Sequence, residues 1–218
     1  MPVFGVPFSR VPLDLPALFG RTAPTILEIG FGMGDTTAEI AAASLDRDFL
    51  AVDVHTPGIG ALLKLVQARG LTNIRIVEHD AREVVDYQLP DEYLTGIHVF
   101  FPDPWPKARH HKRRLIQTQF VEKLATKLTL GGYLHLATDW PDYADQMQDA
   151  VDSTTTLLRL PAAALLTPAT AAGLPAGSGA WRPPERPTTR FERRGLALGH
   201  PIVDIVAIRN VEKAHVTG

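Results

Sequence analysis

A single carboxylate stands in a proline-rich segment that runs directly into a cluster of basic side chains. Residues 100 to 107 read Phe-Phe-Pro-Asp-Pro-Trp-Pro-Lys, and the carboxylate among them is Asp103. Each proline fixes its own φ angle and biases the residue before it toward extended conformations, so we expect this loop to be held in place. A held carboxylate with Trp105 and basic side chains beside it indicates chemistry on a nucleic acid.

The basic cluster begins at Lys107 and ends at Arg114, and five of these eight residues are lysine or arginine. The whole chain carries a formal net charge of −2, so affinity for a polyanion must come from a local concentration of cations. A solvated charged face is the usual explanation of a charge run. Here no acid interrupts the run, and phosphate contacts would offset the repulsion, so we interpret it as an RNA-binding surface. We expect these cations at the start of a helix, where they oppose the helix dipole.

Length and composition indicate one sizeable domain with an elaboration. The chain has 218 residues, of which 45% are hydrophobic and 21% charged, and this is ordinary for a globular domain with a full hydrophobic core. The lack of cysteine excludes disulfides, thiolate metal sites and cysteine nucleophiles. No signal-peptide pattern and no apolar stretch of membrane-spanning length occurs, so we expect a cytoplasmic protein that does not associate with membranes.

Strand and helix patterns alternate along the chain. Short apolar runs that end in glycine or an acid predict buried parallel strands, and amphipathic segments between them predict helices. Gly131 and Gly132 should stop the helix that starts near Leu115, and Pro141 should start the next helix. This order predicts a doubly wound α/β domain. The expected strands are residues 24–30, 49–54, 73–78, 97–101, 133–137 and 202–208, and the expected helices are 36–43, 60–68, 115–128 and one from 141.

Three segments are expected to lie outside this regular pattern. Residues 1–24 should form a proline-rich N-terminal segment, before a domain that covers residues 25–210. Inside that domain, residues 161–187 are rich in Ala, Pro, Gly and Thr, so we expect a loop insertion there. Residues 211–218 are expected to be a C-terminal tail.

A glycine-rich turn follows the first expected strand, at the place where ligands bind in open α/β sheets. Residues 28 to 34 read Glu-Ile-Gly-Phe-Gly-Met-Gly. A dinucleotide fingerprint would need glycine at position 35, where Asp35 would instead face a pyrophosphate. An acid before closely spaced glycines suits S-adenosylmethionine, which has a cationic amino-acid end and no phosphate. The predicted cofactor-binding residues of this turn are Glu28, Gly30, Gly32 and Gly34.

Two further acids follow the next two strands. Asp53 closes the second strand, where a carboxylate can accept hydrogen bonds from both ribose hydroxyls of a nucleoside. Asp80 follows the third strand, where it can accept from an adenine amino group. A helix cap or a solvated acid is the alternative for either residue alone. Their order at successive strand ends favours an adenosine pocket.

These segments resemble the class I S-adenosylmethionine-dependent methyltransferases, and four motifs narrow the resemblance to the bacterial-type tRNA (guanine-N7)-methyltransferase family. The motifs are residues 100–107, 109–114, 137–140 and 186–195, and the likeness extends over residues 26 to 209. The resemblance implies a Rossmann-like sheet of seven strands, mostly parallel with an antiparallel last strand. It implies S-adenosyl-L-methionine as cofactor and methylation of N7 of the guanine at position 46 in the tRNA variable loop. No obligatory protein partner is expected.

The resemblance also implies a role for individual residues. Asp103 matches the family's proposed catalytic acid, and with Glu28, Asp53 and Asp80 it matches the acids on the cofactor side. Two positions depart from the family's pattern, which often has glutamate in place of Asp53 and lysine in place of Arg190. The shorter side chain of Asp53 reaches less far toward the ribose, and Arg190 has a planar guanidinium where lysine has a compact ammonium group. The implied substrate contacts are Lys107, Asp139, Thr189, Arg190, Phe191 and Glu192, and the implied RNA contacts are Arg109, His110, His111, Lys112, Arg113 and Arg114.

The chemistry can also be argued from the residues alone. Guanine N7 carries an exposed lone pair, so its attack on a sulfonium methyl needs alignment and favourable electrostatics rather than a strong base. Asp103 could bind the amino group of the methionyl moiety or the guanine N1–H and N2–H donors. In either case we expect it to orient and stabilise positive charge rather than to remove a proton. Asp139 and Glu192 would accept hydrogen bonds from the Watson–Crick edge of guanine and so reject adenine.

Aromatic and histidine side chains give weaker signals. Trp105, Trp140 and Phe191 are candidates for stacking on an extruded base, with ordinary packing as the alternative. The histidines lack the spacing of a metal site, so no metal is expected, and His98 should be packed within a strand. No serine lies in a nucleophile elbow. The alternatives to the implied activity are methylation of another RNA, a protein or a small molecule, and a non-catalytic RNA-binding scaffold.

Overall fold

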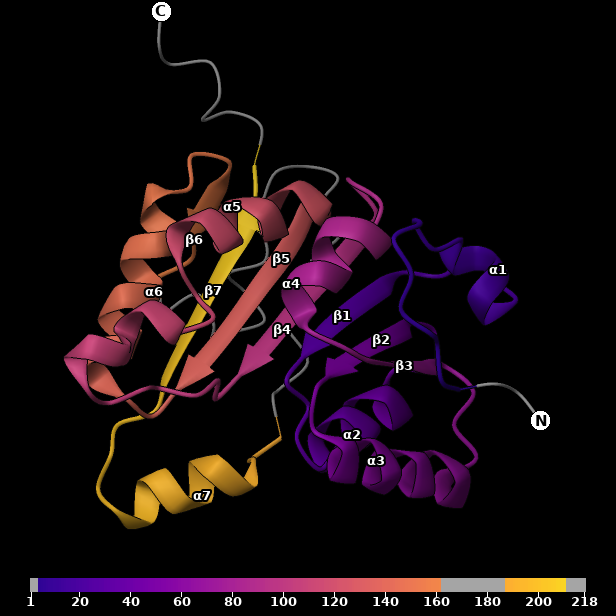
Figure 1. Cartoon of the computed structure of the whole chain (residues 1–218), viewed down its shortest axis with the longest axis horizontal. Coiled ribbons are helices and arrows are strands. Elements are labelled where there is room, and N and C mark those ends of the chain that lie inside the picture. Colours follow the sequence, from indigo (N-terminus) through magenta and orange to yellow (C-terminus); the bar gives the residue numbers. More distant parts are fainter. Residues whose placement is uncertain (1–3, 162–186, 211–218) are drawn as a thin grey trace, which may run out of the picture.

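A seven-stranded sheet with helices on both faces forms the centre of the molecule (Figure 1). The computed structural model describes residues 4–161 and 187–210. The strands are β1 Thr25–Ile29, β2 Asp48–Asp53, β3 Ile74–Glu78, β4 Leu94–Phe100, β5 Leu128–Thr138, β6 Leu157–Arg159 and β7 Val203–Arg209. The helices are α1 Leu15–Phe19, α2 Asp35–Ala43, α3 Thr56–Arg69, α4 Ala81–Glu83, the π-helical turn η1 Val84–Gln88, the 3₁₀ helix η2 Ala108–Arg113, α5 Thr118–Lys127, α6 Pro141–Ser153 and α7 Arg190–Ala197.

The strand order is β3-β2-β1-β4-β5-β7-β6. All pairs from β3 to β5 are parallel, and β7 is antiparallel to both of its neighbours. In Figure 1 the yellow arrow of β7 accordingly points opposite to β4 and β5. The first strand, β1, lies inside the sheet. Strands β2 and β3 follow on one side of it, and β4 then pairs with its other side. This arrangement confirms the expected doubly wound, Rossmann-like sheet with an antiparallel last strand.

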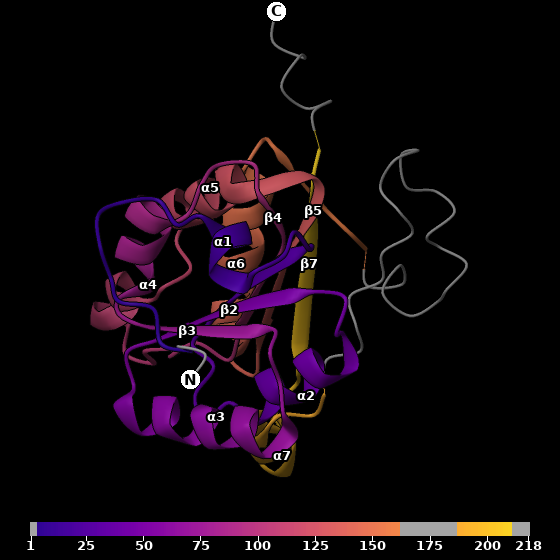
Figure 2. The same ribbon diagram turned by 90° about the vertical axis from the view of Figure 1, so that its right-hand side faces the viewer.

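Apolar cores fill both faces of the sheet. Side chains alternate along a strand, so Ile26 and Leu27 of β1 enter different cores. The Leu27 core is closed by helices α1, α4, α5 and α6, with Met147 of α6 fully buried in it. The Ile26 core is closed by α2 and α3, with Leu62 of α3 fully buried. Figure 2 shows these two groups of helices on opposite sides of the strands.

Most of the expected elements are present, and a few short ones are additional. The six strands and the four helices that the pattern predicts occur within a few residues of their expected ranges. Strand β6 was not evident because it has only three residues, two of them exposed. Helix α7 was not evident because glycine and several charged residues obscure its short apolar pattern. The expected packing of His98 is confirmed, since this residue of β4 is buried and its Nε2 lies 2.6 Å from the Tyr133 hydroxyl.

The prediction that Gly131 and Gly132 stop a helix is wrong. Helix α5 ends at Lys127, where the next residue, Leu128, is already extended and begins β5. Both glycines lie inside that strand, where the pairing with β4 shifts register between Leu94 and Gly96. Gly131 has a φ of 76°, so glycine there allows the strand to adjust its register rather than ending a helix.

The N-terminal segment is packed against the domain from residue 4 onward. Gly5 forms a parallel bridge with Ile76 of β3, and Val6 and Leu15 are buried. The division at residue 24 stays a prediction, as do the other boundaries. The expected loop insertion lies outside the described residues from 162 to 186, and so does the expected tail from 211. Among the residues that the structure describes, no helix is long and apolar enough to cross a membrane.

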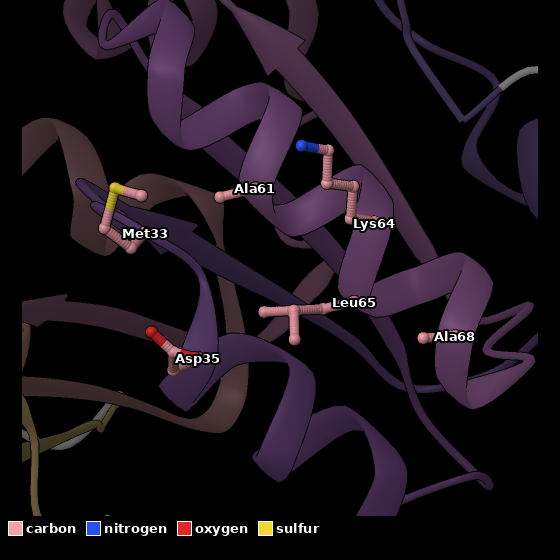
Figure 3. A pocket seen from close by; sticks show the side chains of 6 residues that line it. All are labelled: Met33, Asp35, Ala61, Lys64, Leu65 and Ala68. Atoms are coloured by element: carbon pink, nitrogen blue, oxygen red, sulfur yellow. The ribbon is translucent and has the colours of Figure 1, made fainter.

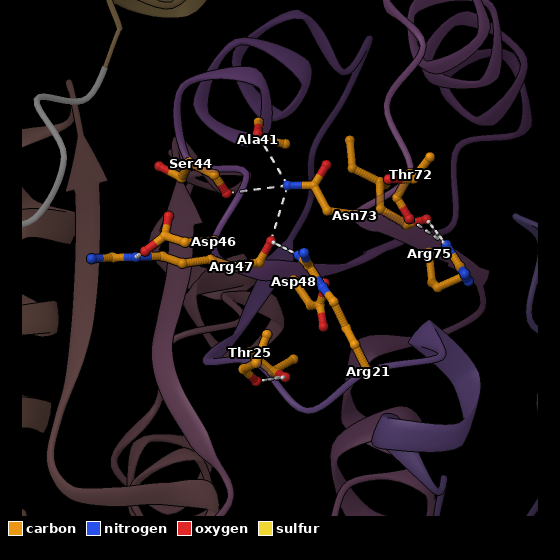
Figure 4. Close-up of polar contacts among 12 residues, drawn as sticks. Arg21, Thr25, Ala41, Ser44, Asp46, Arg47, Asp48, Thr72, Asn73 and Arg75 are labelled. Atoms are coloured by element: carbon orange, nitrogen blue, oxygen red, sulfur yellow. Dashed lines mark hydrogen bonds and ion pairs between the residues drawn. The ribbon is translucent and has the colours of Figure 1, made fainter.

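A polar cluster ties together the amino ends of β1, β2 and β3 (Figure 4). The buried Asn73 side-chain amide donates to the carbonyls of Ala41, Ser44 and Arg47, which form the turn before β2. Arg21 donates to the carboxylate of Asp48 at 2.7 Å, and this carboxylate is almost completely buried. These bonds satisfy the Asn73 amide nitrogen at the amino edge of the sheet, while the buried Asn73 Oδ1 has no hydrogen-bond partner among the described residues.

Candidate active site

The carboxyl ends of neighbouring parallel strands meet at one edge of the sheet, and each of four strand ends carries an acid. Glu28 is the penultimate residue of β1, and Asp53 is the last residue of β2. Asp103 follows the end of β4, and Asp139 directly follows β5. Because β2, β1, β4 and β5 are adjacent in this order, the structure brings the four predicted acids to one edge. Their functional roles stay predictions.

The glycine turn after β1 is shaped by positive φ angles and by Asp53. Gly30, Gly32 and Gly34 have φ angles of 77°, 58° and 80°, a region that other residues rarely adopt. The backbone N–H of Gly32 donates to Asp53 Oδ2 at 2.8 Å. The other oxygen of Asp53 accepts from the N–H of His55 at 2.9 Å. Asp53 therefore fixes the turn, and its contact with a ribose stays a prediction.

Glu28 is a buried carboxylate without a full set of partners. Its side chain is 3% exposed, and Oε2 has no hydrogen-bond partner in the described part of the chain. Burial raises the pKa of Glu28 from 4.5 to about 7, with a smaller lowering by the nearby Thr37 hydroxyl and a raising by the charge of Asp53. A buried carboxylate of this kind gains from a cationic ligand, because the ligand supplies the missing hydrogen bonds and charge. The residue therefore fits the ammonium end of an amino-acid cofactor.

Asp80 caps a helix, and its contact with the cofactor stays a prediction. Its Oδ1 accepts from the N–H of Arg82 at 2.8 Å at the start of α4. The preceding residue, His79, stacks on Phe8 of the N-terminal segment with ring centroids 3.7 Å apart. The Nε2 of His79 lies 2.7 Å from Oε2 of Glu83, within hydrogen-bond distance. No local pattern in the sequence predicts that the N-terminal segment contacts the residue before Asp80.

The Asp103 loop is held in a strained conformation. Phe101 and Trp105, on either side of Asp103, have φ angles of 52° and 45°, and a bulky residue in this region costs of order 1–3 kcal/mol. Asp103 itself is exposed, and within residues 4–161 and 187–210 its carboxylate makes no hydrogen bond or ion pair. The expectation of a held loop agrees with this geometry. The structure thus presents on this loop an exposed carboxylate without a partner in the described ranges.

The basic run forms a separate short helix rather than the start of a long one. Residues 108 to 113 are the 3₁₀ helix η2, and α5 begins only at Thr118. The cations therefore do not oppose the dipole of α5, and that expectation is wrong. Arg113 places its guanidinium 5.0 Å from the centre of the Trp105 ring, and His110 meets the same ring edge-on at 5.9 Å. The exposed cations of this segment are Lys107, Arg109, Lys112 and Arg113.

Arg114 differs from the other predicted RNA contacts. Its side chain is 1% exposed and bonds Asp142 and Gln146 of α6. Because the guanidinium is enclosed by these partners, it is not available to a phosphate in this structure. The prediction that Arg114 belongs to the RNA-binding surface is therefore not supported. No local sequence pattern distinguishes a buried arginine from an exposed one at the end of a basic run, so the sequence could not predict that Arg114 is buried.

Helix α7 lies under the carboxyl ends of β4 and β5 in Figure 1 and contacts Asp139 closely. A Cβ added at Gly195 would lie 2.9 Å from Asp139 Oδ2. His200 Nδ1 lies 3.5 Å from the same oxygen, and its ring packs edge-on against Trp140 at 6.0 Å. The tight contact shows that α7 is fitted to the Asp139 strand end.

The other predicted substrate residues lie on α7 itself. Thr189 caps the helix, since its buried hydroxyl accepts from the N–H of Glu192 at 3.0 Å. Arg190 is exposed, and Phe191 is 55% exposed while stacking on Phe101 at 6.5 Å. Trp105 and Trp140 are half-buried and engaged in ring contacts, so Phe191 is the most exposed of the three candidate stacking aromatics.

A shallow pocket lies between the glycine turn and α3 (Figure 3). It is lined by Met33, Asp35, Ala61, Lys64, Leu65 and Ala68. None of the four strand-end acids lines this pocket, so it is distinct from the acidic edge. In the described ranges, no group of three or more His, Asp or Glu side chains is arranged to hold a metal ion.

The doubly wound sheet, the glycine turn and the buried acid before it define a class I S-adenosylmethionine-dependent methyltransferase. A family model described as "Putative methyltransferase" matches residues 22–205. A tRNA (guanine-N(7)-)-methyltransferase of Nitrosomonas eutropha is 53% identical over 206 residues, which cover 94% of this chain and 85% of that protein. One of Burkholderia vietnamiensis is 55% identical over 205 residues, which cover 94% and 74%. The chain belongs to the tRNA (guanine-N(7)-)-methyltransferase family.

Solved structures agree with the fold. The 16S rRNA methyltransferase KamB matches with a TM-score of 0.55 at 16% identity, over 90% of this chain and 93% of that one. This likeness supports the fold alone. S-adenosyl-L-methionine is the cofactor of this class, and the buried, partly unsatisfied Glu28 carboxylate together with the close-approach glycine turn fits it.

The raised pKa of Glu28 predicts a pH-dependent stability in the absence of cofactor. A carboxyl whose pKa is raised on folding stabilises the fold fully below its unfolded pKa, and this stability is lost as the pH rises through about 7. Replacing Glu28→Gln should remove this loss. The unfolding free energy of the variant, relative to wild type, should increase by about 3 kcal/mol between pH 4.5 and pH 8 in urea titrations.

The matched control is Glu39→Gln, at an exposed position of α2. It should follow the wild-type pH dependence. If Glu28→Gln also follows wild type at every pH, burial does not raise the pKa of Glu28 in the folded protein.

The contact between Gly195 and Asp139 predicts a kinetic effect of a single methyl group. Alanine favours a helix over glycine by about 1 kcal/mol, so Gly195→Ala should fold, but its Cβ must displace the Asp139 carboxylate. We expect KM for tRNA to rise several-fold with cofactor affinity unchanged, as measured by steady-state kinetics and calorimetry. Gly60→Ala in α3, where a Cβ would meet nothing within 4 Å, is the control and should leave both unchanged. Identical kinetics of the two variants would show that α7 does not constrain Asp139.

Proposed function

We propose that this protein transfers a methyl group from S-adenosyl-L-methionine to N7 of a guanine in tRNA, at position 46 of the variable loop. The names of the relatives support tRNA and guanine N7 as the target. The observation that carries the proposal is the free Asp103 carboxylate, held on a strained loop between the acidic edge of the sheet and an exposed basic segment. A tRNA substrate also supports the expected cytoplasmic location, which stays a prediction.

The cofactor side of the proposed site is formed by the strand-end acids. Glu28 would bind the ammonium of the methionyl group, because its buried oxygen lacks a donor. Asp53 keeps lone pairs for the ribose hydroxyls while it holds the Gly32 N–H. Asp80 would face the adenine. The bound cofactor supplies an electrophilic sulfonium methyl, which guanine N7 can attack without prior deprotonation.

The substrate side would be formed by Asp103, Asp139 and α7. A guanine that is methylated at N7 gains positive charge, and a carboxylate close to its ring stabilises this charge most where little water is present. Asp103 would also accept from the N1–H and N2–H donors of guanine and so keep N7 in line with the methyl. Asp139 and Glu192 are further acceptors for that edge. Adenine, which has an acceptor at N1, would leave these carboxylates unpaired.

The exposed basic segment would bind the tRNA backbone. Its cations lie within a few residues of Asp103 in the chain, so phosphate contacts there would bring the variable loop to the carboxylate. Arg190 and Phe191 on α7 would contact the substrate from the other side of the site. The proposed RNA contacts of the segment are Lys107, Arg109, His110, His111, Lys112 and Arg113.

The proposed role of Asp103 predicts a specific kinetic effect. Asp103→Asn retains the shape of the side chain but removes its charge, so kcat should fall by about 10² to 10³, as for the loss of other electrostatic contacts to a transition state. Cofactor affinity should change much less. Asp46→Asn, at an exposed turn on the opposite edge of the sheet, is the control for general effects of charge. Equal losses in turnover and in cofactor binding would remove the orienting and stabilising role.

The proposed substrate is tested by transfer of a labelled methyl group to unmodified tRNA. Wild-type protein should label a tRNA that has guanine at position 46 and should not label the same tRNA with adenine there. Equal labelling of both would overturn the proposed position. Labelling of neither would favour a methyltransferase for another substrate or a non-catalytic RNA-binding scaffold.

A further inference from the structure

We propose that Arg114 is a positioning residue that holds the Asp103 loop in its reactive conformation, and that it is not a ligand of RNA. The inference rests on the proposed function, because it concerns the geometry of that site. Arg114 lies at the end of the basic run but is buried, whereas the cations before it are exposed. This difference requires a role inside the protein.

The guanidinium of Arg114 connects the Asp103 loop to helix α6. Its Nε donates to the carbonyl of Pro104, the residue after Asp103, at 2.8 Å. Nη1 donates to Gln146 Oε1 at 2.9 Å, and Nη2 donates to Asp142 Oδ2 at 2.8 Å. Three nitrogens thus reach three acceptors, one in the loop and two in the helix.

The packing around this guanidinium favours arginine over any other basic residue. The Arg114 Cζ lies 4.7 Å from the centre of the Tyr143 ring, and Nη2 is 3.1 Å from His111 Nε2. The single carboxylate partner, Asp142, is half exposed, so the buried charge is compensated without burying a second ion completely. A lysine has one side-chain nitrogen, so it could not donate to all three acceptors from the positions that the three guanidinium nitrogens occupy.

The connection matters because the loop is strained. Phe101 and Trp105 have positive φ angles on either side of Asp103, so the loop would relax if nothing held it. The Pro104 carbonyl lies between Asp103 and Trp105, and the Arg114 bond fixes its direction. This bond therefore restricts both the Asp103 side and the Trp105 side of the loop.

Helix α6 connects Arg114 to Asp139, the second acid of the proposed substrate side. It begins at Pro141, two residues after Asp139, and supplies Asp142 and Gln146 from its first two turns. Arg114 thus fixes the loop after β4 relative to the strand end of β5. Beyond the pairing of β4 with β5, Arg114 therefore adds a side-chain link between the segments that carry Asp103 and Asp139, the two acids that would receive guanine.

The test compares Arg114→Lys with Arg113→Ala in the full-length protein. We measure the single-turnover rate at saturating tRNA and cofactor, and the dependence of tRNA affinity on salt. Arg114→Lys should lower the single-turnover rate by on the order of 10- to 100-fold, as expected for a small misplacement of reacting groups. Its salt slope should equal that of wild type. Arg113→Ala should lose about 0.7–0.9 in the slope of log K against log salt, with a smaller effect on the rate.

A second variant covers the case in which Arg114→Lys does not fold. Asp142→Asn removes the carboxylate partner at a half-exposed position, so it should fold and still reduce the single-turnover rate. In Arg114→Ala, added guanidinium ion should restore the rate more than added methylammonium, because only guanidinium has the planar fork. A purely structural role of Arg114 would show no such preference.

The outcomes separate this proposal from the proposed function. Wild-type rates in both Arg114→Lys and Asp142→Asn would overturn the positioning role. A reduced salt slope in Arg114→Lys at an unchanged single-turnover rate would make Arg114 a phosphate ligand after all. If wild-type protein does not methylate tRNA, the proposed function falls instead.

Discussion

The parallel register of four adjacent strands is the constraint on which the rest of the site depends. Parallel strands end at the same edge, so an acid near the end of each of β2, β1, β4 and β5 is brought close to the others. Concentrated negative charge in one region is costly unless cations approach it. Burial raises the pKa of Glu28 to about 7, and the negative charge of Asp53 adds a smaller rise. The edge is therefore suited to a cationic cofactor on one side and to a base that becomes cationic on the other.

The surrounding loops keep this edge open and fixed in shape. Asp53 holds the glycine turn through the Gly32 N–H, which lets a ligand approach the backbone closely. The Asp103 loop is kept in a strained conformation by its prolines and by the buried Arg114. Helix α7 packs on Asp139 at Gly195, where an added Cβ would lie 2.9 Å from the Asp139 carboxylate and displace it. The exposed cations lie beside the acids rather than among them, so they do not neutralise the carboxylates that the chemistry needs.

The sequence predicted the sheet and the placement of its acids because buried parallel strands have a local pattern of short apolar runs. Glu28, Asp53 and Asp103 could be assigned to strand ends for this reason alone. The sequence did not distinguish Arg114 from the exposed arginine before it, because its burial depends on α6, a separate segment of the chain. The prediction that Gly131 ends a helix was wrong, because a glycine that adjusts strand register looks the same in the sequence as one that ends a helix. The fit of α7 against Asp139 joins residues far apart in the chain and leaves no local pattern.

The proposed place of Asp103 is between the cofactor and the guanine, where its carboxylate would act on both by charge and hydrogen bonding. A crystal structure of the protein with S-adenosylhomocysteine and tRNA tests this most directly. We expect the Asp103 carboxylate within hydrogen-bond distance of the guanine N1–H and N2–H or of the methionyl ammonium, with N7 directed at the sulfur. An Asp103 side chain turned to solvent, with the guanine edge bound by other groups, would contradict it.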